Sequence, residues 1–159
     1  TMSGRSTRRF CFEGFLPMDK KEREIVLERL KKETRTTVFY EAPHRLPKTL
    51  KTLRETVGDR RLTICKELTK RYEKTWLTTL DEAIRWYETN EARGEYVLVL
   101  EGVDAKVLEE ERQAAWETMS IEEHLALYMG QGQTKKEAMK SVASDRGMTK
   151  RGVYQYLLH

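Results

Sequence analysis

The sequence predicts an α/β protein: a mixed sheet of about five strands with flanking helices, followed by a small helix-turn-helix-like module of three helices. Strand-like runs of β-branched and aromatic residues alternate with stretches whose apolar residues recur every three or four positions. The last forty residues contain three helix-start signals and no strand-like run. With 159 residues, the chain has the length of one ordinary domain, or of a small domain with an appendage.

Five short runs have the composition of strands. The polar turn between the third and fourth runs is too short for a helical crossover, so these two strands should pair antiparallel or diverge. The last run, EYVLVL, is the most apolar, which predicts a central strand buried on both faces. The five runs cover residues 9–13, 36–40, 61–65, 74–78 and 95–100.

Helices are predicted between these runs. A single apolar stripe on a charged stretch indicates a helix over residues 19–32. A second helix has Pro47 in its first turn, where the missing N–H does little harm, and it ends at Gly58. Thr79 and Glu82 have the spacing of a capping box, in which each side chain bonds the other residue's backbone, ahead of a third helix.

The C-terminal part has a different character. Capping boxes are predicted at Ser120–Glu123 and Thr134–Glu137, and Thr149 should cap the last helix after a glycine-containing turn. Lys150 and Arg151 fall at the start of that helix, where helix-turn-helix modules contact nucleic acid. Such small helical modules also serve as dimerisation or packing units.

The charge distribution also suggests that the C-terminal part contacts nucleic acid. From residue 134 onward there are six basic and two acidic residues, so the whole formal net charge of +4 lies in the last 26 residues. A neutral body with a basic tail suggests attraction to a polyanion, although the same charges also suit a solvated helical surface.

These patterns predict four segments. The polar, aperiodic start should be a linker or a frayed terminus rather than part of the core. The segments are a linker or domain start over 1–9, an α/β domain over 10–103, a helical connector over 104–118, and the helix-turn-helix-like module over 119–159.

Several classes of protein are excluded by the sequence. No apolar run approaches the roughly 20 residues of a membrane-spanning helix, and no secretory signal is expected. Cys11 and Cys65 lie in strand-like runs, which predicts buried free thiols, a reducing compartment and hence a cytoplasmic protein, with no disulfide or zinc site. Nucleotide-binding loops, zinc-protease motifs and nucleophile elbows do not occur, so we expect no self-contained active site and no metal.

Polar residues follow three of the predicted strands. Glu13–Gly14 follow the first, residues 41–45 the second and residues 67–70 the third. Open α/β sheets bind ligands at the carboxyl ends of their strands, so these three ends form a candidate site.

Each of these residues also has a structural interpretation. Glu41 and Arg45 could form an ion pair at a helix start, His44 could cap that helix, and Glu67 could pair with a neighbouring lysine. His124, on a helix face, is predicted to be a surface or packing residue.

Four stretches carry a family resemblance: FCFEGFLP at 10–17, FYEAPHRLPKTL at 39–50, GDRRLTICKELTK at 58–70 and GEYVLVLEG at 94–102. In order and spacing they resemble the C-terminal half of the ribosomal RNA small subunit methyltransferase I family, within the tetrapyrrole methylase superfamily. The resemblance covers about ninety residues of the chain. The helical tail resembles the small helical domain at the end of many members, with a looser match.

The resemblance implies transfer of a methyl group from S-adenosylmethionine to the ribose 2′-hydroxyl of a cytidine in 16S rRNA, within ribosome biogenesis. It also implies a homodimer, and an additional N-terminal α/β domain with a glycine-rich loop that completes the cofactor cleft. The fragment alone is therefore expected to be inactive.

On this reading the residues divide into three groups. The candidate bases are Glu41 and His44. The residues expected at the cofactor cleft are Glu13, Gly14, Phe15, Leu16, Pro17, Tyr40, Ala42, Glu67, Leu68 and Thr69. The residues expected to meet RNA phosphates are Arg8, Arg9, Arg45, Lys70, Arg71, Lys150 and Arg151.

Two other functions fit parts of the sequence. A methylase of the same superfamily acting on a corrin or porphyrin precursor would also use basic residues, but it gives no reason for a basic helical tail. A non-catalytic nucleic-acid-binding module would use the α/β part as a dimerisation platform and the tail to bind DNA.

Overall fold

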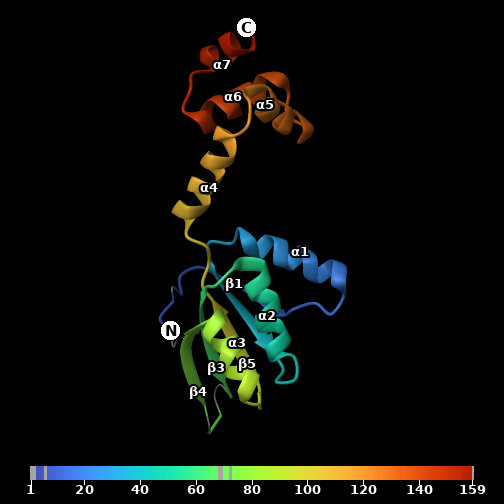
Figure 1. The fold of residues 1–159 in the computed structure, drawn as a ribbon, viewed down its shortest axis with the longest axis vertical. Helices are drawn as coiled ribbons and strands as arrows, with labels where there is room; N and C mark the ends of the chain where they lie inside the picture. Colours follow the sequence, from blue (N-terminus) through green and yellow to red (C-terminus); the bar gives the residue numbers. More distant parts are fainter. Residues whose placement is uncertain (1–2, 6, 68–69, 72, 159) are drawn as a thin grey trace. The chain divides into compact units, whose positions relative to one another are not determined.

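A computed structural model describes residues 3–5, 7–67, 70–71 and 73–158 (Figure 1). Contacts within the chain divide it into two units, Thr1–Asp104 and Ala105–His159. The first contains a sheet with helices and the second is helical, as the sequence predicts. Among the described residues, no helix combines the length and apolar character required to cross a lipid bilayer.

The described part of the first unit contains one mixed sheet in the order β1-β2-β5-β3-β4. Strands β1 and β2 are parallel, while β5 pairs antiparallel with both β2 and β3. Strands β3 and β4 pair antiparallel, one of the two predicted arrangements. The strands are β1 (Phe10–Phe15), β2 (Thr36–Glu41), β3 (Arg61–Lys66), β4 (Lys74–Thr79) and β5 (Tyr96–Leu100).

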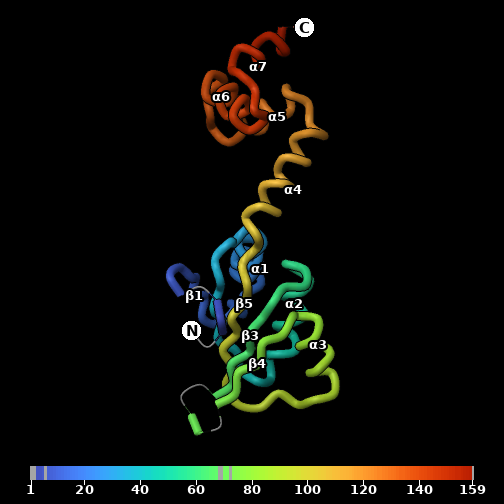
Figure 2. Tube along the Cα trace, turned by 90° about the vertical axis from the view of Figure 1, so that its left-hand side faces the viewer, coloured from blue at the N-terminus to red at the C-terminus, as the bar shows by residue number. Residues whose placement is uncertain are grey.

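Three helices cover one face of this sheet: α1 (Lys20–Lys31), α2 (Leu46–Val57) and α3 (Leu80–Thr89). Figure 2 shows the helices on one side of the strands. One buried cluster joins Leu30 of α1, Leu50 of α2 and Ala83 of α3 to Phe39 of β2 and Leu98 of β5. The core of the unit therefore lies between the helical layer and the sheet.

Strand β5 is central but is not buried on both faces, so that prediction is wrong. Tyr96, Leu98 and Leu100 are buried, whereas Val97 and Val99, which point the other way, are only half-buried. None of the three described helices of this unit covers the second face. Apolar composition alone did not distinguish one helical layer from two.

The helix-start predictions hold in part. The Thr79 hydroxyl accepts a hydrogen bond from the Glu82 amide at 3.3 Å, as predicted. The Glu82 carboxylate does not return to the Thr79 backbone but accepts from the Thr78 hydroxyl at 2.8 Å. The second half of that capping box is therefore wrong, because a closer hydroxyl donor competes for the carboxylate.

The polar N-terminal segment is not frayed at the residues described. Ser3 is buried, and the Arg5 guanidinium forms an ion pair with Glu101 at 3.0 Å, just after β5. This contact ties the segment to the end of the sheet, so of the two predicted descriptions, a linker or a frayed terminus, the second is wrong for the described residues.

The two cysteines are free thiols. Cys65 is buried, whereas Cys11 is only half-buried, so the prediction of burial is right for the first alone. Burial is the main cause that raises the pKa of both thiols.

The second unit consists of four described helices: α4 (Ala105–Glu117), α5 (Ile121–Gly130), α6 (Lys135–Arg146) and α7 (Lys150–Leu157). The capping boxes at the starts of α5 and α6 are both complete, as predicted. Helix α6 ends at Gly147 in the left-handed conformation, with φ of 62°. Val142 of α6 and Val153 of α7 are fully buried and hold these helices together.

A buried histidine organises the polar interior of this unit. His124 is fully buried and stacks between Trp116 and Tyr128, at centroid distances of 5.2 and 5.4 Å. Arg146 Nε donates to His124 Nδ1 at 3.1 Å, so Nε2 carries the proton and donates to Asp145 at 3.2 Å. Burial, followed by the Arg146 charge, lowers the pKa of His124. His124 is thus a packing residue, one of the two predicted roles.

Candidate functional site

The three polar strand ends meet at one edge of the sheet. Strand β3 is separated from β2 by the antiparallel β5, so β1, β2 and β3 all run in the same direction. Glu41 and Lys66, the last residues of β2 and β3, both pair with Tyr96 of β5. We name the described part of residues 13–17, 40–45 and 66–67 the strand-end edge.

The Glu41 carboxylate lies inside the protein, with 1% of its side chain exposed. One of its oxygens accepts from the Thr49 hydroxyl at 2.6 Å, and the other accepts from the Ala42 amide at 2.9 Å. Arg45 Nε lies 3.8 Å from the carboxylate, and its Nη2 donates to the Leu16 carbonyl at 3.2 Å. The predicted Glu41–Arg45 ion pair thus ties β2, α2 and the loop after β1 together.

His44 lies in the turn between β2 and α2, and its side chain is exposed. No described residue forms a hydrogen bond or an ion pair with its imidazole. It does not cap α2, whose N-cap residue, Arg45, makes no side-chain capping bond. A free imidazole at the strand-end edge can accept a proton from a ligand.

The end of β1 carries a bulge. The register with β2 shifts between Phe12 and Gly14, leaving Glu13 as the additional, exposed residue. Gly14 takes φ of 65°, which glycine adopts readily. The rings of Phe12 and Phe15 lie against Tyr40 edge to face, at 5.1 and 5.8 Å, and all three are partly exposed. The two other predicted residues of this segment are buried Leu16 and half-buried Pro17.

The end of β3 is closed by Glu67, which has φ of 53°. Its carboxylate accepts from the Glu95 amide at 2.7 Å and lies 3.1 Å from Lys70 Nζ, which also contacts the Glu95 carboxylate. The backbone hydrogen bond from Glu95, then Lys70, lowers the pKa of Glu67. Gly94 has φ of 83°, and a Cβ there would lie 2.1 Å from the Glu67 carboxylate, so a larger residue would be strained and would require that carboxylate to move. The predicted Leu68 and Thr69 lie outside the described residues.

The predicted RNA-contacting residues fall into two groups. Arg45 and Lys70 are engaged in the contacts given above. The others have exposed side chains, on the first unit before β1 and after β3 and on the second unit at the start of α7: Arg8, Arg9, Arg71, Lys150 and Arg151.

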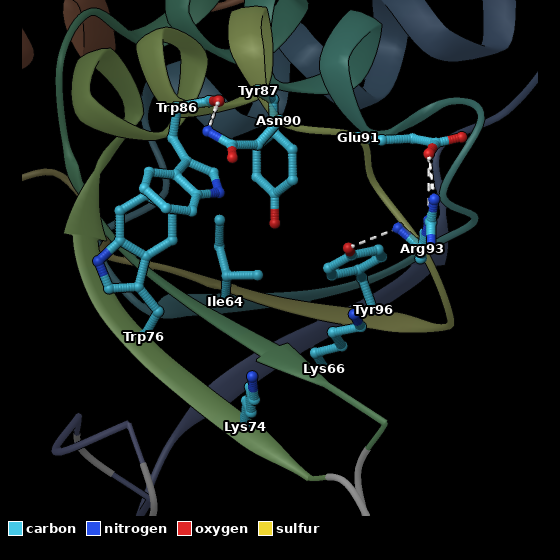
Figure 3. Close-up of a pocket in the computed structure, with 10 residues that line it drawn as sticks. All are labelled: Ile64, Lys66, Lys74, Trp76, Trp86, Tyr87, Asn90, Glu91, Arg93 and Tyr96. Atoms are coloured by element: carbon cyan, nitrogen blue, oxygen red, sulfur yellow. Dashed lines mark hydrogen bonds and ion pairs between the residues drawn. The ribbon is translucent and has the colours of Figure 1, made fainter.

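Two features of this edge were not predicted. Thr49 supplies the hydrogen bond to Glu41, and a threonine eight residues away carries no sequence signature of that role. A cavity of about 640 Å³ opens between α3 and the ends of β3, β4 and β5, with tryptophan, tyrosine and lysine side chains on its walls (Figure 3). The sequence offered one sign of this cavity: two lysines, Lys66 and Lys74, at the ends of strands that pair with each other.

An open mixed sheet that gathers polar strand ends at one edge is the architecture of an α/β ligand-binding domain. The family model of the Tetrapyrrole (Corrin/Porphyrin) Methylases matches residues 2–84. The chain belongs to this family.

Curated relatives extend the similarity to nearly the whole chain. Ribosomal RNA small subunit methyltransferase I of Bacillus subtilis (strain 168) is 45% identical over 96% of this chain and 52% of its own length. The protein of the same name from Halalkalibacterium halodurans is 44% identical over the same shares. Among solved structures, one titled "Crystal structure of the methyltransferase CobJ" gives a TM-score of 0.43 at 21% identity, over 60% of this chain and 42% of that one. The chain spans about half the length of the curated relatives it matches.

Proposed function

We propose that this chain forms the C-terminal portion of an S-adenosylmethionine-dependent methyltransferase that modifies the ribose 2′-hydroxyl of a cytidine in 16S rRNA. The observation that carries the proposal is 45% identity, over 96% of the chain, with a relative named for methylation of small-subunit ribosomal RNA. The strand-end edge supports it, because it provides a place where a domain of this family can receive a ligand.

The described residues suit part of the methyl donor. S-adenosylmethionine, when bound, supplies a methyl group on a positively charged sulfur. Phe15 and Tyr40 expose aromatic faces against which a planar base can pack, and Glu13 exposes a carboxylate that suits the donor's positive charge. The carboxylates of Glu41 and Glu67 are occupied by contacts within the chain, so their role is to hold the edge in shape.

Of the two candidate bases, we propose His44. Its exposed imidazole has a free nitrogen to accept the proton of the 2′-hydroxyl as the oxygen takes the methyl group. Glu41 is buried and already accepts two hydrogen bonds, which makes it a positioning residue for Arg45 and the loop after β1.

The exposed basic residues of each of the two units support contact with RNA phosphates.

We also propose a homodimer in the cytoplasm. Size-exclusion chromatography with light scattering tests the dimer, and a single-chain mass would reject it.

The test uses the protein that contains this chain, over the full length of its relatives, with purified small subunits and S-adenosylmethionine. Mass spectrometry of the digested rRNA should find a 2′-O-methylcytidine. H44A should lower the methylation rate about 10²- to 10⁴-fold, the usual contribution of a general base. K48A changes an exposed lysine of α2 that makes none of the contacts described for Glu41, and it should leave the rate unchanged.

Three results would overturn parts of the proposal. An unaffected H44A enzyme removes that residue's role. Methylation of a corrin or porphyrin precursor in place of rRNA would favour the alternative that the family's description carries. Tight, sequence-selective binding of duplex DNA without methyl transfer would favour a non-catalytic nucleic-acid-binding module.

A further inference from the structure

The cavity beside α3 has the dimensions of a ligand site. Its volume of about 640 Å³ lies within the roughly 300–1,000 Å³ of small-molecule pockets. It opens on the helical side of the sheet, between the end of α3 and strands β3, β4 and β5 (Figure 3). None of its wall residues belongs to the cofactor or base candidates described above.

Aromatic rings form much of its wall. Trp76 of β4 and Trp86 of α3 lie edge to face with centroids 5.8 Å apart, and Trp86 is 52% exposed. Tyr87 and Tyr96 meet at 6.2 Å, and the Tyr96 hydroxyl accepts from the Arg93 amide at 3.0 Å, which fixes that ring. Partly exposed, flat apolar faces on a fixed frame suit a planar aromatic ligand.

Two lysines also give the cavity wall positive charge. Figure 3 shows the ammonium group of Lys74 directed toward the open space below the aromatic rings, and Lys66 beside Tyr96. Within the described residues, neither lysine takes part in an ion pair, whereas Arg93 at the same cavity is paired with Glu91 at 2.8 Å. A ligand that combines a flat ring with an anionic group complements both features.

We propose that this cavity binds one unpaired nucleotide of single-stranded RNA, with its base against Trp86 and a flanking phosphate at Lys66 and Lys74. The inference rests on the proposed function, which makes RNA the substrate, and it adds a second point of attachment on the helical side of the sheet. Stacking on aromatic side chains combined with backbone neutralisation by lysine is how proteins hold single-stranded nucleic acid. An acidic peptide would satisfy the lysines but leave the tryptophan faces without a planar partner.

The experiment measures affinity for a fluorescein-labelled hexaribonucleotide at low salt by fluorescence anisotropy, using the full 159-residue chain. W86A should weaken binding about 10- to 100-fold, the loss expected for one stacked base, while W86F should recover most of the affinity. K74E should weaken binding as well and reduce its salt dependence. K51E, a matched charge reversal at an exposed position of α2, should stay within twofold of the wild type, and circular dichroism should show all variants folded.

Several outcomes overturn the proposal: no measurable affinity in the wild type, unchanged affinity in both W86A and K74E, or displacement of the RNA by S-adenosylhomocysteine, a porphyrin or an acidic peptide.

The methyl-transfer assay tests the proposed function independently of the cavity. If the hexamer binds as expected but the longer protein never methylates rRNA, the proposed function fails and the cavity assignment stands. If methylation is normal while W86A and K74E bind RNA like the wild type, only the cavity assignment fails.

Discussion

Replacing Thr49 by valine tests whether the buried Glu41 network holds the strand-end edge together. The substitution removes the hydroxyl that donates to the Glu41 carboxylate at 2.6 Å, in a site where both residues are at most 5% exposed. A hydrogen bond to a charged group is worth about 1.5–3 kcal/mol. The carboxylate keeps the Ala42 amide and Arg45, so it is not left unpaired, and we expect T49V to lower the free energy of unfolding by about 2 kcal/mol.

The assay is urea unfolding followed by NMR at the backbone amides of β2, so that only the first unit is read. T49S, which keeps the hydroxyl and loses one methyl group, should cost about 0.8 kcal/mol or less. In an E41Q background the cost of T49V should fall to about half, because hydrogen bonds to neutral groups are weaker. A loss below about 0.5 kcal/mol for T49V, which is the range of neutral surface changes, would refute the reasoning.

Two further predictions concern the loop after β3 and the second unit. G94A should lower the thermal midpoint more than G58A does. Both glycines have positive φ, but only at Gly94 would the new Cβ overlap a neighbour, the Glu67 carboxylate. Equal losses in the two variants would contradict this prediction. The pKa of His124 is lowered in the folded unit, so below about pH 6.5 the unfolded chain binds the proton more readily and the second unit should lose stability as the pH falls. Urea unfolding read at α5 amides at pH 7 and pH 5 checks this, and a pH dependence that persists in H124Q would point to another group.

The helices and strands could be predicted because the local signals in the sequence agreed with one another. Apolar period, capping residues and Gly58 placed the helices within a few residues of where they lie, and the short turn before β4 limited that strand pair to two arrangements. The failures lie where the outcome depends on packing. Whether β5 is covered on one face or two, and whether Glu82 bonds Thr78 or the Thr79 backbone, depends on neighbours that are distant in sequence or compete locally.

The site could be predicted in position but not in chemistry. The carboxyl-end rule brought Glu13, Glu41 and Glu67 to one edge from their places after predicted strands. It could not show that Glu41 is enclosed by α2, since that depends on the depth at which the helix packs. The cavity escaped prediction because Trp76 and Trp86 come from different elements and meet only in the folded chain.

The bulge in β1 determines which side chains of that strand lie on the same face of the sheet. Side chains of a regular strand alternate between its two faces, so residues three positions apart point to opposite faces. The additional residue Glu13 shifts this alternation by one position. Phe12 and Phe15 therefore lie on the same face of the sheet, where both contact Tyr40. Shortening the strand by Glu13 itself would preserve this arrangement, whereas an insertion or deletion beside another residue of β1 would turn Phe15 inward and Leu16 outward. The bulge is therefore the one place in this strand where a residue could be lost without changing the side on which Phe15 lies.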